Sequence, residues 1–181
     1  MAYKNKILSN PGMKIRFIQT AKDTEGELLE MESTHYPGST EPPVHYHPHQ
    51  TEFFTVLSGE ITVRINNHLQ IFSEGESFIT KPGERHSMWN SSAKKTVMNW
   101  KVMPALETEI WFETLNGLLK EGKPVTKGLK GILQMSLTAK KFSAVFRVIH
   151  PPYRLQQLLF NLLSPSARLA GYRAVYKRFI D

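Results

Sequence analysis

The stretch His45-Tyr46-His47-Pro48-His49-Gln50-Thr51-Glu52, followed by His86 34 residues after Glu52, decides how this chain is interpreted. One residue separates His45 from His47, so in an extended segment both side chains point to the same side. Glu52 reaches that side only if residues 48–51 form a turn that leads into a second strand. Imidazole nitrogens and a carboxylate oxygen are a common ligand set for divalent transition metals. The pattern therefore predicts a mononuclear metal site.

Two blocks of sequence share a regular spacing of glycine and potential ligand residues. The first block consists of Gly38, six residues, His45-x-His47, four residues, Glu52, six residues and Gly59. The second consists of Gly75, seven residues, Gly83, two residues, His86, three residues and Asn90. Over residues 38–90 this double pattern resembles the two motifs of the cupin superfamily. Lys81 is a departure, because the family usually has a proline at this position.

The resemblance implies an all-β fold, a cupin barrel of the double-stranded β-helix or jelly-roll type, with a metal in its lumen. His45, His47, Glu52 and His86 would hold one divalent ion, for which iron, manganese, nickel, copper and zinc are all suitable. An octahedral geometry leaves two positions for water, substrate or dioxygen. His49 does not fit the spacing and is expected at the rim or in solvent.

Short segments rich in β-branched and aromatic residues predict strands throughout the first part of the chain. The expected strands are residues 14–20, 26–34, 44–47, 52–57, 61–65, 69–72, 77–80, 86–89 and 96–103, with a hairpin turn at Asn66-Asn67. If Glu52 faces the lumen, so do Phe54 and Val56. If His86 does, Met88 and Asn90 share its side. We predict these four neighbours as the substrate pocket, with ordinary packing in the barrel core as the alternative for each.

The spacing of apolar residues becomes helical from about Pro104. Leu106, Ile110, Leu115 and Leu118 or Leu119 recur near one helical turn, and Glu121-Gly122-Lys123-Pro124 ends this helix. Further helices are expected at residues 129–149, 152–163 and 165–179. We therefore predict a barrel domain at residues 1–103 and a helical extension at residues 104–181.

Charge is divided unevenly between the two parts of the chain. Residues 1–121 contain 12 lysines and arginines against 15 acidic residues, whereas residues 122–181 contain 11 against one. A basic amphipathic helical segment can bind an anionic membrane surface, a polyanion or an acidic partner. The simpler alternative is that these helices fold back on the barrel or exchange with a second subunit. No apolar run is long enough for a transmembrane helix, and no nucleic-acid-reading motif accompanies the charge, so nucleic acid is not expected.

Composition limits the compartment and the chemistry. The chain has no cysteine, so disulfides and thiolate chemistry are excluded. The first twenty residues contain no apolar run of signal-peptide length, which predicts a cytoplasmic protein. Exposed sheet edges in a small barrel favour pairing, and we expect a homodimer.

The ligand set favours a dioxygenase or another oxidoreductase that acts on a small organic substrate, because similar cupins with three histidines and one glutamate include dioxygenases. In that reaction Glu52 could double as a base. One alternative is a metal-dependent isomerase, epimerase or lyase, which needs a separate proton acceptor, for which His49 and Tyr36 are candidates. The other alternative is a non-catalytic protein that binds a small ligand.

Overall fold

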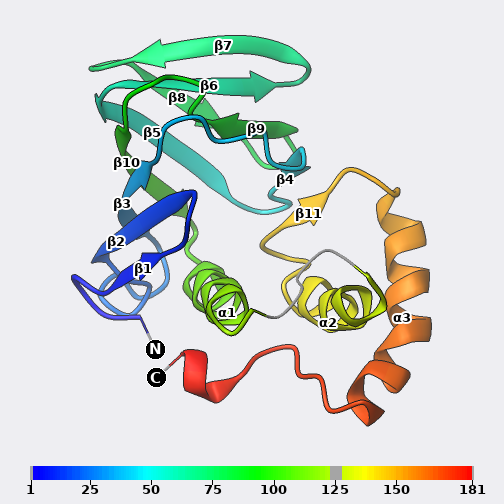
Figure 1. Cartoon of the computed structure of the whole chain (residues 1–181). Helices are drawn as coiled ribbons and strands as arrows, with labels where there is room; N and C mark the ends of the chain where they lie inside the picture. Colours follow the sequence, from blue (N-terminus) through cyan, green and yellow to red (C-terminus); the bar gives the residue numbers. More distant parts are fainter. Residues whose placement is uncertain (1, 123–127, 181) are drawn as a thin grey trace.

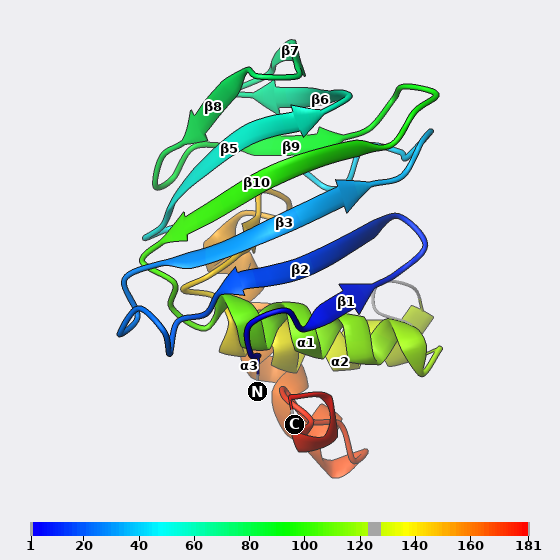
Figure 2. The same ribbon diagram turned by 90° about the vertical axis from the view of Figure 1, so that its left-hand side faces the viewer.

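Two antiparallel sheets face each other in the computed structural model, which describes residues 2–122 and 128–180 (Figure 1, Figure 2). The six-stranded sheet has the order β1 (Ile7–Ser9), β2 (Met13–Gln19), β3 (Leu29–His35), β10 (Thr96–Met103), β5 (Thr51–Ser58) and β8 (Ser77–Thr80). The five-stranded sheet has the order β11 (Arg147–Val148), β4 (His45–Tyr46), β9 (His86–Trp89), β6 (Glu60–Ile65) and β7 (His68–Ser73). This arrangement confirms the predicted all-β barrel.

The core of the barrel lies between the two sheets because apolar side chains alternate along the strands. In β6, Ile61 and Val63 are fully buried, as the alternation of that segment predicts. Asn66 and Asn67 have φ values of 47° and 71° and connect β6 to β7 in a tight hairpin. Asparagine tolerates these positive φ values, so the predicted turn is confirmed.

The predicted strands are present, and β8, β9 and β10 have the predicted bounds. Two strands were not predicted. β1 has only three residues, and β11 has two, which is too short for a periodicity to show. β11 exists because Arg147 and Val148 pair with Tyr46 and His45 at the free edge of β4.

Among the described residues, three helices follow the barrel: α1 (Thr108–Lys120), α2 (Gly128–Lys141) and α3 (Tyr153–Leu169), with a 3-10 turn η1 (Lys177–Phe179). The helix predicted for residues 129–149 is wrong in its second half, because the chain leaves the helix after Lys141 and adds β11 to the sheet. The division predicted between Leu163 and Pro165 is also wrong. α3 continues through Pro165, and Ser164 and Ala167 are buried on either side of it.

The helices are attached to the barrel through side chains of both parts. α1 lies next to β1, and α2 lies between α1 and α3 (Figure 1). Gln50 is buried and donates hydrogen bonds to the Pro104 and Ala105 carbonyls, 2.9 and 3.1 Å away, and to the Thr108 hydroxyl at 2.8 Å. It thus fixes the point at which the chain leaves β10 and enters α1.

Candidate metal centre

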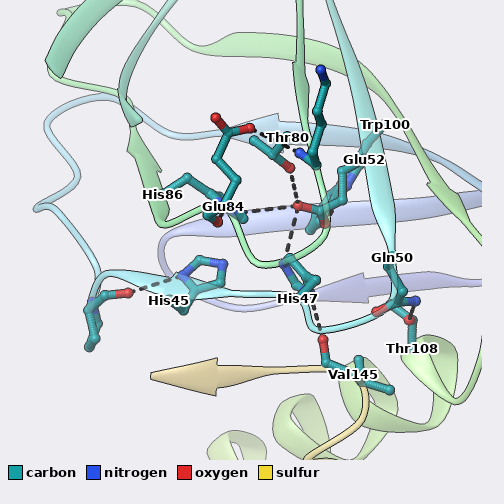
Figure 3. A network of polar contacts seen from close by, with 12 residues as sticks. His45, His47, Gln50, Glu52, Thr80, Glu84, His86, Trp100, Thr108 and Val145 are labelled. Atoms are coloured by element: carbon teal, nitrogen blue, oxygen red, sulfur yellow. Dashed lines mark hydrogen bonds and ion pairs between the residues drawn. The ribbon is translucent and has the colours of Figure 1, made fainter. Parts of the chain in front are cut away.

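Three histidine rings meet at one end of the barrel lumen (Figure 3). His45 on β4 and His86 on β9 are direct partners in the sheet, and His47 follows β4 on the same side, as the spacing predicts. One nitrogen from each ring lies within 4.8 Å of the others. This group of imidazoles could hold a metal ion.

The orientation of the three rings follows from hydrogen bonds to the backbone. Nδ1 of His45 lies 3.1 Å from the Pro43 carbonyl, Nδ1 of His86 lies 3.1 Å from the Glu84 carbonyl, and Nδ1 of His47 lies 2.6 Å from the Val145 carbonyl. A carbonyl oxygen only accepts, so each Nδ1 carries a proton. In the neutral ring, Nε2 then carries no proton and presents a lone pair. This tautomer can bind a metal through Nε2.

Glu52 stands beside two of these nitrogens. Its Oε2 atom lies 3.2 Å from His47 Nε2 and 3.1 Å from His86 Nε2. The Thr80 hydroxyl donates to the same oxygen at 3.0 Å, and the Trp100 indole N–H donates to Oε1 at 3.1 Å (Figure 3). These donors fix the carboxylate in position and support its ionised form.

The charges of the centre are set by burial and by mutual contact. Burial, together with His86 and His47, lowers the pKa of His45 to about 3. Burial also opposes a charge on His47, but the Glu52 carboxylate outweighs burial and raises the pKa of His47. Burial disfavours the Glu52 carboxylate as well, yet the adjacent His47 and His86 hold the pKa of Glu52 well below its usual range. Glu52 therefore remains ionised, which suits a ligand better than a base.

The residues fit a divalent metal ion. Nε2 of His47 and Nε2 of His86 are buried without a hydrogen-bond partner among the described residues, although both face Glu52. A lone pair directed at a carboxylate is stable only if a cation, either a proton or a metal, is shared between them. His45, His47 and His86 would hold the metal, with Glu52 as the predicted fourth ligand.

A cavity of about 360 Å³ opens beside this centre. Its walls come from the barrel and from the helical extension alike, since Trp89 and Trp100 line it from the strands and Trp111, Phe112 and Phe146 line it from beyond residue 103. Phe146 stacks on the His45 ring with a centroid distance of 4.5 Å. The predicted boundary at residue 103 stays a prediction, but the cavity extends across it.

The four residues predicted for the pocket have different places. Met88 lines the cavity. Phe54 and Val56 point into the lumen, where they belong to the buried core and not to the cavity wall, and Phe54 stacks on Phe78 at 4.7 Å. The buried Asn90 amide donates to the His35 and Lys94 carbonyls and so stabilises a turn. His49 is exposed, as expected for a residue at the rim.

Other residues of the site were not predicted from the sequence. Val145 and Phe146 come from the segment after α2, and no local pattern places that segment against His47 and His45. His35 lines the cavity at the end of β3, and its alternation with Ser33 and Met31 was the available signal. Burial lowers the pKa of His35 to about 4, so its ring is neutral at pH 7.

Comparison with known proteins agrees with this fold. Residues 32–102 match the family model of the cupin domain. The chain contains a cupin domain. All four predicted ligands lie inside the matched residues, and the segments that supply Val145 and Phe146 lie outside them.

Solved structures share the cupin fold at low sequence identity. An RmlC-like cupin from Shewanella frigidimarina matches with a TM-score of 0.50 and 20% identity, over 59% of this chain and 89% of that chain. A predicted oxalate decarboxylase from Thermotoga maritima matches with a TM-score of 0.50 and 20% identity, over 56% and 92% of the two chains. These similarities concern the fold alone.

One curated relative shares a short segment with the cupin domain. A protein of Arthrobotrys oligospora named as an oxidoreductase is 40% identical over 55 residues, which is 30% of this chain and 22% of that relative. The chain therefore corresponds to less than a quarter of the relative's length.

Proposed function

We propose that this cupin is a metal-dependent oxidoreductase of the dioxygenase type that acts on a small organic substrate. The observation that carries the proposal is the buried cluster of three imidazoles and one carboxylate at the wall of an apolar cavity. A bound divalent ion would supply a Lewis acid and, if it is redox-active, a path for electrons between the substrate and dioxygen. The oxidoreductase name of the Arthrobotrys oligospora relative is in keeping with this class.

The cavity limits the substrate class. A volume of about 360 Å³ is at the lower end of the range for small-molecule sites. Aromatic rings line it on several sides, from Trp89 and Trp100 to Trp111 and Phe146, and the Thr108 hydroxyl adds a polar group. We infer a small, flat or apolar molecule with one or two oxygen atoms that approach the histidine cluster.

The chain's own residues prepare the site for this task. Backbone carbonyls hold each histidine in the tautomer that presents Nε2, and Thr80 and Trp100 hold Glu52 in place. Preorganised ligands of this kind need little rearrangement when a metal binds. The aromatic wall of the cavity excludes water from the substrate's apolar part.

A second candidate is a metal-dependent isomerase or lyase, and the position of His35 favours it. This reaction needs a proton acceptor besides the metal ligands. His49 is exposed and Tyr36 is not part of the cavity wall, whereas His35 lines the cavity and its buried Nε2 has no hydrogen-bond partner in the described part of the chain. His35 is thus better placed for this role than either residue predicted from the sequence.

Metal content and oxygen consumption decide between the two candidates. We expect tag-free protein, purified without chelator, to contain iron, manganese, nickel or copper by elemental analysis, and Glu52→Gln to contain much less. The loaded protein should consume oxygen with enols, diketones or phenols. If zinc is the metal, and the protein exchanges substrate protons with deuterated water without consuming oxygen, the isomerase is correct. In that case His35→Asn should abolish the exchange while metal content is unchanged.

A further inference from the structure

The solvent-facing side of α3 carries a row of leucines. Leu155, Leu158, Leu159 and Leu162 follow each other at the spacing of one helix face, and Leu169 continues the row at the C-terminal end of the helix. Leu158 and Leu162 are 55% and 65% exposed, and Leu169 is 90% exposed. A group of exposed leucines on one helix face is unusual on a protein surface and marks a contact site.

The packing of α3 does not use this row. A different side of the helix, with Gln156, Ser164 and Ala167, is buried, and α3 packs on α2. Gln156 also donates to the Val148 and Pro151 carbonyls, which fixes that side toward β11. In Figure 1, α3 forms an outer edge of the molecule, with α2 between it and α1. In the part of the chain that the structure describes, the leucine row is therefore largely exposed and accessible to an external partner.

The positive charge beside the leucine row indicates which class of partner fits this face. Arg154 and Arg168 lie along one edge of the leucine row at the two ends of α3, and residues 122–181 contain 11 lysines and arginines against one acidic residue. A second copy of this face would bring like charges together, which opposes self-association through it. An anionic surface has the complementary charge, and leucines flanked by arginines are typical of helices that lie in a membrane interface.

We propose that the outward face of α3 docks on an anionic phospholipid bilayer. In this arrangement the leucine row enters the interface between head groups and acyl chains, and Arg154 and Arg168 contact the head groups. The helix lies parallel to the membrane plane. Among the described residues no helix is long and apolar enough to cross a membrane, so the contact is peripheral. This proposal is independent of the reaction at the metal centre.

Vesicle co-sedimentation of the full chain tests the proposal. We expect the protein to sediment with mixed phosphatidylcholine–phosphatidylglycerol vesicles and to stay in solution with pure phosphatidylcholine vesicles, and high salt should weaken binding. Leu158→Ser/Leu162→Ser should lower the partition coefficient at least tenfold. The matched control is Leu69→Ser/Ile71→Ser on β7, because these side chains are equally exposed, at 56% and 61%, on another surface. It should bind like the unmodified chain.

The charge contribution has its own pair of variants. Arg154→Gln/Arg168→Gln should weaken binding to anionic vesicles, whereas Lys94→Gln/Lys95→Gln removes the same charge from exposed positions of the cupin domain and should have little effect. Thermal unfolding of each variant verifies that the fold is intact. Equal effects of the two pairs would mean that only net charge matters, and this would overturn docking through α3.

The absence of cysteine permits a direct measurement of the contact. When a polarity-sensitive fluorophore is attached to Leu162→Cys, its emission maximum should shift to the blue on addition of anionic vesicles. The same label on Leu69→Cys should show no shift. No shift at Leu162 would overturn the proposal. So would a dimer in sedimentation velocity that Leu158→Ser/Leu162→Ser dissociates, because the leucine row would then be a subunit interface.

Discussion

The cupin domain and α3 differ in how far their apolar side chains are exposed to solvent. In the sheets Leu29, Ile61 and Val63 are fully buried, whereas in α3 Leu158 and Leu162 are more than half exposed. Strands of a two-sheet barrel have one inner face, so alternation shows which side chains of a strand share a face. α3 has apolar residues around most of its circumference, and only contact with α2 decides which of them are covered. Periodicity is thus a good guide to burial in most strands of the first region, with Leu69 and Ile71 of β7 as exposed exceptions, and an ambiguous one in the second.

The two regions nevertheless meet at one site. The barrel supplies the four potential ligands, and the segment after α2 supplies the Val145 carbonyl for His47 and the Phe146 ring against His45. If the barrel alone bound the metal, changes beyond residue 103 would not affect binding. The predictions below test this division, from the largest expected effect to the smallest.

Loss of a ligand should have the largest effect. We expect His47→Ala and Glu52→Ala to remove most bound metal, as measured by elemental analysis, while circular dichroism shows an intact barrel. His49→Ala should retain its metal because His49 is exposed and outside the cluster. Equal metal loss in all three variants would show that the ligands are assigned wrongly.

The junction between the regions should contribute strongly to stability. Gln50→Ala leaves the buried Ala105 carbonyl and the partly buried Pro104 carbonyl without this donor and should lower the free energy of unfolding by about 2 kcal/mol. Urea denaturation followed by tryptophan fluorescence measures this change, with Gln70→Ala at an exposed position as the control. Two separate unfolding transitions would show that the barrel and the helical extension unfold independently, which would contradict a strong contribution of this junction.

The extension should also tune the metal centre. Phe146→Ala removes the ring that stacks on His45 and on Trp111, with centroid distances of 4.5 and 5.2 Å, so His45 loses its orientation. Metal affinity, measured by competition with a chromophoric chelator, should fall by roughly tenfold. Phe160→Ala in α3 is the control. Unchanged affinity in Phe146→Ala would mean that the barrel alone determines metal binding.

The smallest effect concerns a carboxylate of α1. Burial raises the pKa of Glu109, whose oxygen accepts the Ala21 N–H at 2.6 Å. A raised pKa in the folded state means that the neutral form is preferred, so its stabilising contribution is present at acid pH and lost as pH rises through that pKa. Glu109→Gln keeps the acceptor and should stabilise the protein at pH 7 by up to about 1 kcal/mol.

The gain from Glu109→Gln should disappear near pH 4, where Glu109 itself is protonated. Glu113 provides the contrast, because it is paired with Lys6 at 2.6 Å and Glu113→Gln should destabilise the protein at pH 7. Thermal unfolding at both pH values measures these differences. A gain from Glu109→Gln that is equal at pH 4 and pH 7 would exclude burial of charge as its cause.

Much of the centre could be predicted because its residues lie on a few strands. The His45-x-His47 spacing places both rings on one side of an extended segment, and the turn before Glu52 returns the chain to that side. Residues from distant segments could not be found in this way. Val145 is 98 positions from His47, and β11 is recognisable as a strand only through its pairing with β4.

The sequence by itself therefore determined the alternating strands, the hairpin at Asn66-Asn67 and the shared side of His45 and His47, since alternation within a strand is a local property. The barrel and the place of His86 beside these two histidines were implied by the resemblance to the two cupin motifs. Only the tertiary structure decided that Phe146 covers His45, that His35 lines the cavity and that the leucine row of α3 faces outward. The physical reason is that burial depends on which distant segments come to lie side by side. Local periodicity shows which side chains share a face, and it leaves open what that face will contact.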